Sequence, residues 1–158
     1  MTPQQRYKQA HHDYMMRTAK DFYELSGGWK YKLTMPKVKA ANGLTNFICN
    51  YLNWKGHRAT RVNVMGRIID KVEVQPSGTR LKVKRYIPST TRKGTADISA
   101  TINGLSVMLE IKIGSDRPSE YQLAEQQRER AAGGVYEFIK TPEDFFAVYD
   151  RIAGNVVN

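Results

Sequence analysis

An Asn-Gly dipeptide between two alternating apolar segments constrains this fold more than any other feature of the sequence. Asn103 and Gly104 separate strand-like segments at 95–102 and 105–113. Asn-Gly in such a context is the strongest short-range signal for a hairpin with a two-residue turn. With these residues in the turn, Ile102 faces Leu105, and each step outward along the strands gives the next facing pair. The sequence therefore predicts an antiparallel hairpin of defined register.

This register places two carboxylates opposite each other. Counting outward from the turn, Asp97 faces Glu110, with Cβ atoms about 5 Å apart. Side chains alternate between the faces of a strand, so Lys112 shares the face of Glu110 while the apolar residues point the other way. Two facing carboxylates repel unless a cation neutralises them. Oxygen ligands favour a hard ion such as Mg²⁺ or Mn²⁺.

Lys112 has two interpretations at this position. It can orient or deprotonate an attacking water, or neutralise charge that builds up on a phosphoryl group. Alternatively, the hairpin is an ordinary surface feature on which Lys112 pairs with one of the acids. The second interpretation accounts less well for the facing Asp97, because one lysine would then serve two carboxylates.

The remaining pattern predicts an α/β sandwich around a mixed sheet. A helix at 3–25 should end at Gly27-Gly28, and a second helix near 42–55 should be capped by Asn42 or Thr45. Several strands follow from Ala59 onward, with turns at Gly66 and Pro76-Ser77-Gly78. After the hairpin come a helix at 119–132, a strand at 135–140 and a helix opened by Thr141. We expect one domain over 1–158, with an N-terminal helix and basic connection at 1–40, a core at 41–158 and a basic hairpin insertion at 66–93.

Positive charge is concentrated in the middle of the chain. Residues 30–93 contain 15 Lys and Arg against 2 Asp and Glu, whereas residues 94–158 contain 6 against 10. A block this one-sided predicts a polyanionic partner, although a lysine-rich face that only aids solubility is an alternative. We expect nucleic-acid contacts from Arg61, Arg80, Lys82, Lys84, Arg85, Arg92 and Lys93. Those in the hairpin, Arg80, Lys82, Lys84 and Arg85, would bind the nucleic-acid backbone without reading its sequence. Alternatively, the hairpin lysines only protect a sheet edge from aggregation.

Other features point to a cytoplasmic protein. No apolar run approaches the length of about 18 residues that would span a bilayer, and the N-terminus lacks the apolar stretch of a secretory signal. The single cysteine, Cys49, cannot form an internal disulfide. We therefore expect no membrane association and a location in the cytoplasm, in a bacterial or phage-infected cell.

Four short motifs occur in order between residues 93 and 145. They are Lys93-Gly94-Thr95-Ala96-Asp97-Ile98, Glu110-Ile111-Lys112, Ser119-Glu120-Tyr121-Gln122 and Ala132-Gly133-Gly134-Val135-Tyr136. An Asp on one strand and Glu-x-Lys on the next resemble the PD-(D/E)xK nuclease superfamily. The four motifs together resemble its VRR-NUC branch, the virus-type replication-repair nucleases.

The resemblance implies a restriction-endonuclease-like core, a mixed sheet flanked by helices, with Mg²⁺ or Mn²⁺ as cofactor. Asp97, Glu110 and the backbone carbonyl of Ile111 would bind the metal, Lys112 would be the catalytic lysine, and Gln122 would point toward the same site. Ser119-x-x-Gln122 is also a capping box, and the two roles of Gln122 are compatible. The implied substrate is branched, flapped or four-way-junction DNA in replication, recombination or repair. A homodimer would suit a two-fold junction.

The sequence departs from the family in its first core helix. That helix often supplies another acid, but residues 42–55 contain no Asp or Glu. Candidate replacements are Asn42, Asn46 and Asn50, or Asp21 and Glu24 from the first helix. One metal is therefore our expectation. The alternatives are a catalytically inactive nucleic-acid-binding protein of the same fold, and a restriction-type or mobile-element endonuclease.

Overall fold

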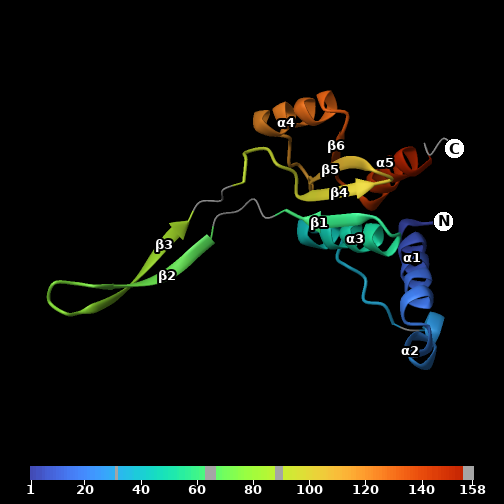
Figure 1. Ribbon diagram of the computed structural model, residues 1–158, viewed down its shortest axis with the longest axis horizontal. Coiled ribbons are helices and arrows are strands. Elements are labelled where there is room, and N and C mark those ends of the chain that lie inside the picture. The colour runs from blue at the N-terminus through green and yellow to red at the C-terminus, as the bar shows by residue number, and fades with distance from the viewer. Residues whose placement is uncertain (31, 63–66, 88–90, 155–158) are drawn as a thin grey trace.

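The computed structural model describes residues 1–30, 32–62, 67–87 and 91–154. The elements follow the predicted order of helices, strands, helix, strand and helix (Figure 1). Their bounds are α1 Pro3–Thr18, α2 Lys20–Leu25, a 3₁₀ turn η1 Gly28–Lys30, α3 Ala41–Trp54, β1 Arg58–Arg61, β2 Arg67–Val74, β3 Arg80–Ile87, β4 Ile98–Ile102, β5 Leu105–Ile111, α4 Glu120–Ala131, β6 Val135–Ile139 and α5 Pro142–Gly154. No helix within the described ranges is both long and apolar enough to cross a membrane.

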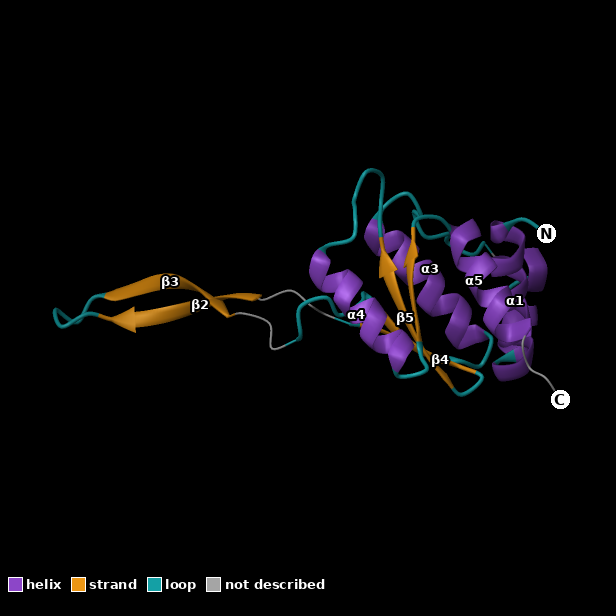
Figure 2. Ribbon diagram, turned by 90° about the horizontal axis from the view of Figure 1, so that it is seen from above, coloured by secondary structure: helices purple, strands orange, loops and turns teal. Residues whose placement is uncertain are grey.

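A four-stranded mixed sheet lies at the centre of the fold. The strand order is β1-β4-β5-β6, with antiparallel pairing up to β5 and parallel pairing of β5 with β6. Helices α3 and α5 pack on the apolar face of this sheet, whereas α4 lies on the other face (Figure 2). The expected α/β class, a mixed sheet flanked by helices, is confirmed.

The predicted register of the central hairpin is confirmed over the length of β4. Ile102 pairs with Leu105 at the turn, and Ile98 pairs with Leu109 at the far end. Asn103 and Gly104 both have positive φ, at 50° and 82°. These are the conformations that a two-residue turn of this kind requires and that Asn and Gly tolerate.

The apolar face of the sheet forms the main core together with the helices. Ile98 and Leu109 are fully buried there against α3 residues such as Leu44 and Ile48. The N-terminal extension is anchored to this core, because Tyr7 of α1 stacks on Phe47 of α3 at 4.4 Å between ring centroids. Burial of large apolar side chains is the dominant stabilising contribution in a domain of this size.

Two predictions about the first helices are wrong. The helix at 3–25 is interrupted at Ala19, whose φ of −152° and ψ of 46° break the helix between α1 and α2. The N-cap of α3 is Ala40, and neither Asn42 nor Thr45 caps it. The turn at 37–40 brings the chain into helix earlier than the sequence pattern suggests, so that the Asn42 side chain accepts a hydrogen bond from Arg61 instead, at 2.7 Å.

The predicted basic insertion forms a separate two-stranded sheet. Strands β2 and β3 pair with each other and project away from the central sheet (Figures 1 and 2). Every described side chain from residues 68–86 is exposed except that of Ile69, which is half-buried. The turn predicted at Pro76-Ser77-Gly78 is present, with Gly78 at φ 81°, whereas the predicted turn at Gly66 falls outside the described residues.

Candidate active site

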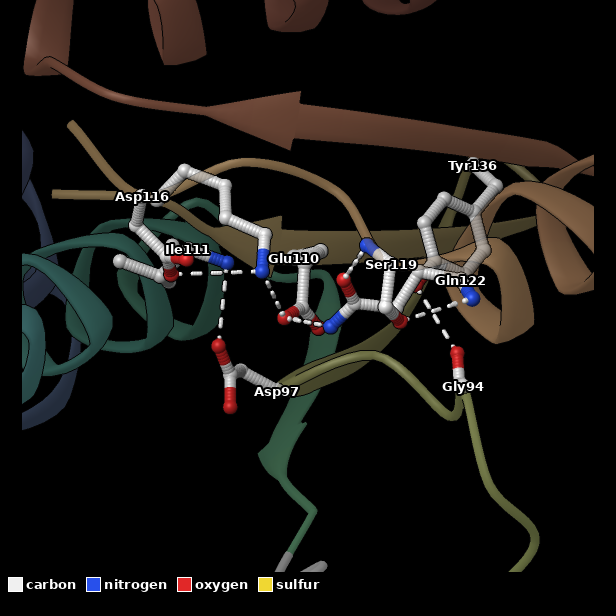
Figure 3. Close-up of polar contacts among 9 residues, drawn as sticks. Gly94, Asp97, Glu110, Ile111, Asp116, Ser119, Gln122 and Tyr136 are labelled. Carbon is white, nitrogen blue, oxygen red and sulfur yellow. Dashed lines mark hydrogen bonds and ion pairs between the residues drawn. The ribbon is translucent and has the colours of Figure 1, made fainter.

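The predicted site residues converge at one end of the β4–β5 hairpin (Figure 3). Asp97 immediately precedes β4, and its Oδ2 accepts a hydrogen bond from the backbone N–H of Ile111 on β5, at 3.0 Å. The backbone carbonyl of Asp97 accepts a hydrogen bond from Val62 N at 2.8 Å, which ties it to the chain after β1. Ile111 thus holds the Asp97 carboxylate, and Val62 holds the Asp97 backbone.

Glu110 is a buried carboxylate on the α4 side of the sheet, with 6 % of its surface exposed. Its Oε1 accepts a hydrogen bond from Gln122 Nε2 at 2.5 Å and lies 3.3 Å from Lys112 Nζ. Burial and the negative charge of Asp97 raise the pKa of Glu110 to about 7, and Lys112 offsets only part of that rise. The site therefore disfavours two uncompensated negative charges.

Lys112 is buried to a similar degree, with 5 % exposed, and its ammonium has two acidic partners. It lies 3.3 Å from Glu110 Oε1 and 3.3 Å from Asp116 Oδ2. Asp116 was not identified from the sequence. An acid four residues after a lysine is too common in sequences to indicate a contact. The path of the loop between β5 and α4 is what brings Asp116 to Lys112.

The Gln122 side chain forms the predicted capping box and also points toward Glu110. The side-chain Oε1 of Gln122 accepts a hydrogen bond from Ser119 N at 2.9 Å. The backbone N–H of Gln122 donates to Ser119 Oγ at 3.4 Å, which completes the capping box of α4. The other end of the side-chain amide donates to Glu110. The start of α4 is thereby fixed against the carboxylate, and the Gln122 side chain is oriented by the cap.

Gly94 and Tyr136 position the loop that leads to Asp97. The Tyr136 hydroxyl donates to the Gly94 carbonyl at 2.9 Å (Figure 3). Gly94 has φ 86°, and a Cβ at this position would lie 2.3 Å from the Tyr121 carbonyl oxygen. Only glycine allows this close approach to α4. Burial, with the charges of Glu110 and Asp97, raises the pKa of Tyr136, so its hydroxyl remains a donor.

A cleft of about 390 Å³ opens beside these residues. Its lining includes Glu110 and Gln122, the cations Arg92 and Lys93, and Tyr86 of β3. Lys93 lies over the Tyr121 ring at 5.1 Å from its centroid, and Arg92 lies 3.6 Å from Glu125. The cleft therefore combines the buried carboxylate of Glu110 with the exposed cations Arg92 and Lys93, an arrangement suited to a phosphodiester.

The other predicted nucleic-acid contacts are not at the carboxylates. Arg61 is exposed at the end of β1, where it donates to Asn42. Four further residues lie on the projecting strand β3, well away from the central sheet (Figure 1); these are Arg80, Lys82, Lys84 and Arg85. Arg92 and Lys93, in contrast, line the cleft itself.

The expected replacements for a further acid are mostly elsewhere. Asn50 donates to the Tyr7 hydroxyl at 3.1 Å, on the side facing α1. Asp21 and Glu24 belong to α2, at the opposite end of the fold from α4 (Figure 1). Asn46 is exposed, and Asn42 bonds to Arg61. Of these five residues, only Asn42 is linked to the site's edge, because Arg61 pairs with Ile98 beside Asp97.

The residues present fit a hard divalent cation that takes its remaining ligands from water and phosphate oxygens. Asp97 Oδ1, Glu110 and the Ile111 carbonyl are oxygen donors, and the raised pKa of Glu110 shows that this site disfavours its negative charge. Within the described part of the chain, no three His, Cys, Asp or Glu side chains are grouped to hold a metal ion. Two carboxylates with waters and phosphate oxygens as remaining ligands are the usual arrangement for Mg²⁺.

No protein-family model and no curated protein matches this chain.

Proposed function

We propose that this chain is a metal-dependent nuclease that hydrolyses phosphodiester bonds in DNA, with a PD-(D/E)xK-type core. The supporting observation is that Asp97 and Lys112 lie beside Glu110, a buried carboxylate that lines a cleft together with Arg92 and Lys93. Branched, flapped or four-way-junction DNA is the proposed substrate class, following the resemblance to the VRR-NUC branch. Homodimerisation on a two-fold junction remains part of this proposal.

A bound Mg²⁺ or Mn²⁺ would polarise the phosphate and make its bound water more acidic. Asp97 and Glu110 would hold it, together with the carbonyl of Ile111, the residue after Glu110. The backbone N–H of Ile111 orients the Asp97 carboxylate, and the Gln122 amide orients that of Glu110. These hydrogen bonds keep both carboxylates in position before substrate arrives, which lowers the reorganisation that reaction requires.

Lys112 has the position to act on the reacting phosphate. Its ammonium is held between Asp116 and Glu110, and Glu110 lines the cleft. A buried cation here stabilises negative charge that develops on the phosphoryl oxygens, because the local dielectric constant is low. Once a divalent cation shares Glu110, Asp116 continues to hold the ammonium in place.

Two surfaces are proposed to bind the DNA backbone. The cleft presents Arg92 and Lys93, and the projecting hairpin presents Arg80, Lys82 and Lys84 on one of its faces. Alternate residues of a strand share a face, so these three side chains can contact successive phosphates together. Such contacts give affinity without sequence readout.

Cleavage of labelled linear, flapped and four-way DNA with Mg²⁺ tests the proposal. Asp97→Asn and Lys112→Ala should each lower the cleavage rate by about 10²- to 10³-fold while binding in EDTA is largely retained. Asp13→Asn and Lys140→Ala change the same residue types at exposed positions and should cut normally. Far-ultraviolet circular dichroism would verify that each variant is folded.

The inactive-binder alternative makes a different prediction in the same assay. It has support in the pairing of Lys112 with two acids and in the small number of carboxylates at the site. A wild-type chain that binds DNA but cuts no substrate with Mg²⁺ or Mn²⁺ would contradict the nuclease proposal and favour this alternative. Cutting of a single linear sequence would favour the restriction-type function.

A further inference from the structure

A groove on the N-terminal helical extension has no role in the proposed chemistry. A hollow of about 400 Å³ lies between α1, α2 and the segment after η1, lined by Lys8, His11, Tyr23, Trp29, Lys30 and Lys32. A second hollow of about 280 Å³ shares Lys8 and Trp29 with the first. Since they share these two residues, the hollows adjoin along α1, and we call them together the α1 groove.

An exposed tryptophan forms the wall of the α1 groove. Trp29 is 58 % exposed, although indoles are among the side chains that gain most from burial. One face of its ring stacks on His12, with ring centroids 4.0 Å apart and planes 15° from parallel. His12 in turn lies 3.3 Å from the hydroxyl of buried Tyr23 through its Nδ1. The indole is thus held in place while much of its surface faces solvent.

The lysines that line the α1 groove give it positive charge. Lys8, Lys30 and Lys32 are exposed, and none of the described residues that line either hollow is acidic. A fixed aromatic surface within a basic groove is the arrangement that binds single-stranded nucleic acid, in which bases stack and lysines follow the phosphates. A duplex presents its bases edge-on, so it cannot use the aromatic wall in this way.

The α1 groove is separate from the candidate active site. Helices α1 and α2 lie at one end of the fold, whereas α4 and the β2–β3 hairpin lie at the other (Figure 1). A substrate that reaches both would have to extend across the molecule. Flapped DNA has an unpaired strand beside its duplex part, and this shape matches the arrangement.

We propose that the α1 groove binds an unpaired strand of nucleic acid, with a base stacked on Trp29 and phosphates at Lys8, Lys30 and Lys32. The groove proposal rests on the proposed function, which makes nucleic acid the partner. It extends that function by naming an unpaired strand as part of the substrate. Binding at the groove does not require cleavage.

Binding of an oligothymidylate of about 12 nucleotides to the full chain in EDTA tests the proposal. We expect the oligonucleotide to quench Trp29 fluorescence. Trp29→Ala should weaken binding by about 5- to 150-fold, the range for loss of one stacked base, whereas Trp29→Phe should retain most of it. Trp54 remains as the other tryptophan in both variants, so fluorescence also reports on folding.

The exposed lysines provide a second test that leaves the aromatic packing intact. Lys30→Gln with Lys32→Gln should reduce the slope of log affinity against log salt by about 1.4, at about 0.7 for each lost phosphate contact. Lys39→Gln with Lys140→Gln removes the same charge from exposed positions outside the groove and should leave the slope unchanged. Loss in both pairs alike would overturn the proposal.

Two further outcomes separate this inference from the nuclease proposal. If Lys30→Gln with Lys32→Gln weakens the binding of a duplex of equal length as much as that of the single strand, an unpaired strand is not the ligand. If wild type cuts no DNA but loses oligonucleotide binding in the Trp29→Ala variant, the groove stands and the nuclease proposal fails. Cleavage with unchanged oligonucleotide binding in both groove variants would overturn the groove alone.

Discussion

Glu110→Gln should make the metal-free chain more stable at pH 8 while abolishing cleavage. The pKa of Glu110 is raised from 4.5 to about 7 by burial and by Asp97. A carboxyl whose pKa is higher in the folded state stabilises the fold fully below about pH 4.5. That contribution is lost as pH rises to about 7, because the folded site must then accept the charge.

The size of the effect follows from this change in pKa. At 1.36 kcal/mol for each pH unit by which the folded and unfolded pKa values differ, the full loss is about 3 kcal/mol. Glutamine resembles the protonated carboxyl in shape and cannot ionise, so the variant avoids the loss. Glu110→Gln and wild type should therefore have nearly equal free energies of unfolding at pH 4.5, and the variant should be about 3 kcal/mol more stable at pH 8.

Urea unfolding in EDTA at constant ionic strength measures this difference. All other titrating groups are common to both proteins, so the difference between their free energies of unfolding isolates Glu110. Glu73→Gln removes one carboxylate from the exposed hairpin and is the matched control. A difference that stays constant between pH 4.5 and 8, or one in which the variant is the less stable protein at pH 8, would refute the argument.

Adding Mg²⁺ at pH 8 extends the same experiment. A cation that binds only the folded chain stabilises it by about 1.4 kcal/mol for each tenfold excess over its dissociation constant. Wild type should therefore recover stability with Mg²⁺, whereas Glu110→Gln should not. Equal responses of the two proteins would show that Glu110 does not bind the ion.

Two further predictions concern the hairpin and the glycine before Asp97. Arg80→Gln, Lys82→Gln and Lys84→Gln together should weaken DNA binding and reduce the salt slope by about 2.7, at about 0.9 for each phosphate contact on duplex DNA; an unchanged slope in filter binding would rule out the hairpin as a backbone contact. Gly94→Ala should lose cleavage and stability, because its Cβ would lie 2.3 Å from the Tyr121 carbonyl oxygen. The resulting destabilisation should exceed the roughly 1–2 kcal/mol that the left-handed backbone conformation alone costs. Gly78→Ala has a similar φ, 81°, but open space around it, so equal effects of the two changes on stability and cleavage would contradict the close-approach argument.

Local signals predicted several elements because each depends on neighbouring residues. Asn103-Gly104 requires two positive φ angles, and that turn alone determines which residues of β4 and β5 face each other. Ser119 and Gln122 form the predicted capping box by contacts across one helical turn. The predictions that failed, such as an unbroken helix through Ala19, concern helix boundaries, where weak local preferences compete with packing.

By itself, the sequence determined the turn at Asn103-Gly104 and the register of β4 against β5, since turn chemistry and strand alternation are local. The placement of Asp97 opposite Glu110, one pair beyond this ladder, is a prediction from that register. The tertiary structure alone decided what surrounds them. It buries Glu110 beneath α4, brings Asp116 to Lys112, and ties Tyr136 to Gly94 across 42 residues of sequence. These contacts depend on the paths of loops and on helix packing, which no local pattern specifies. Burial by distant segments, together with the charge of Asp97, is also what raises the pKa of Glu110, and so makes these two neighbouring acids a candidate metal site.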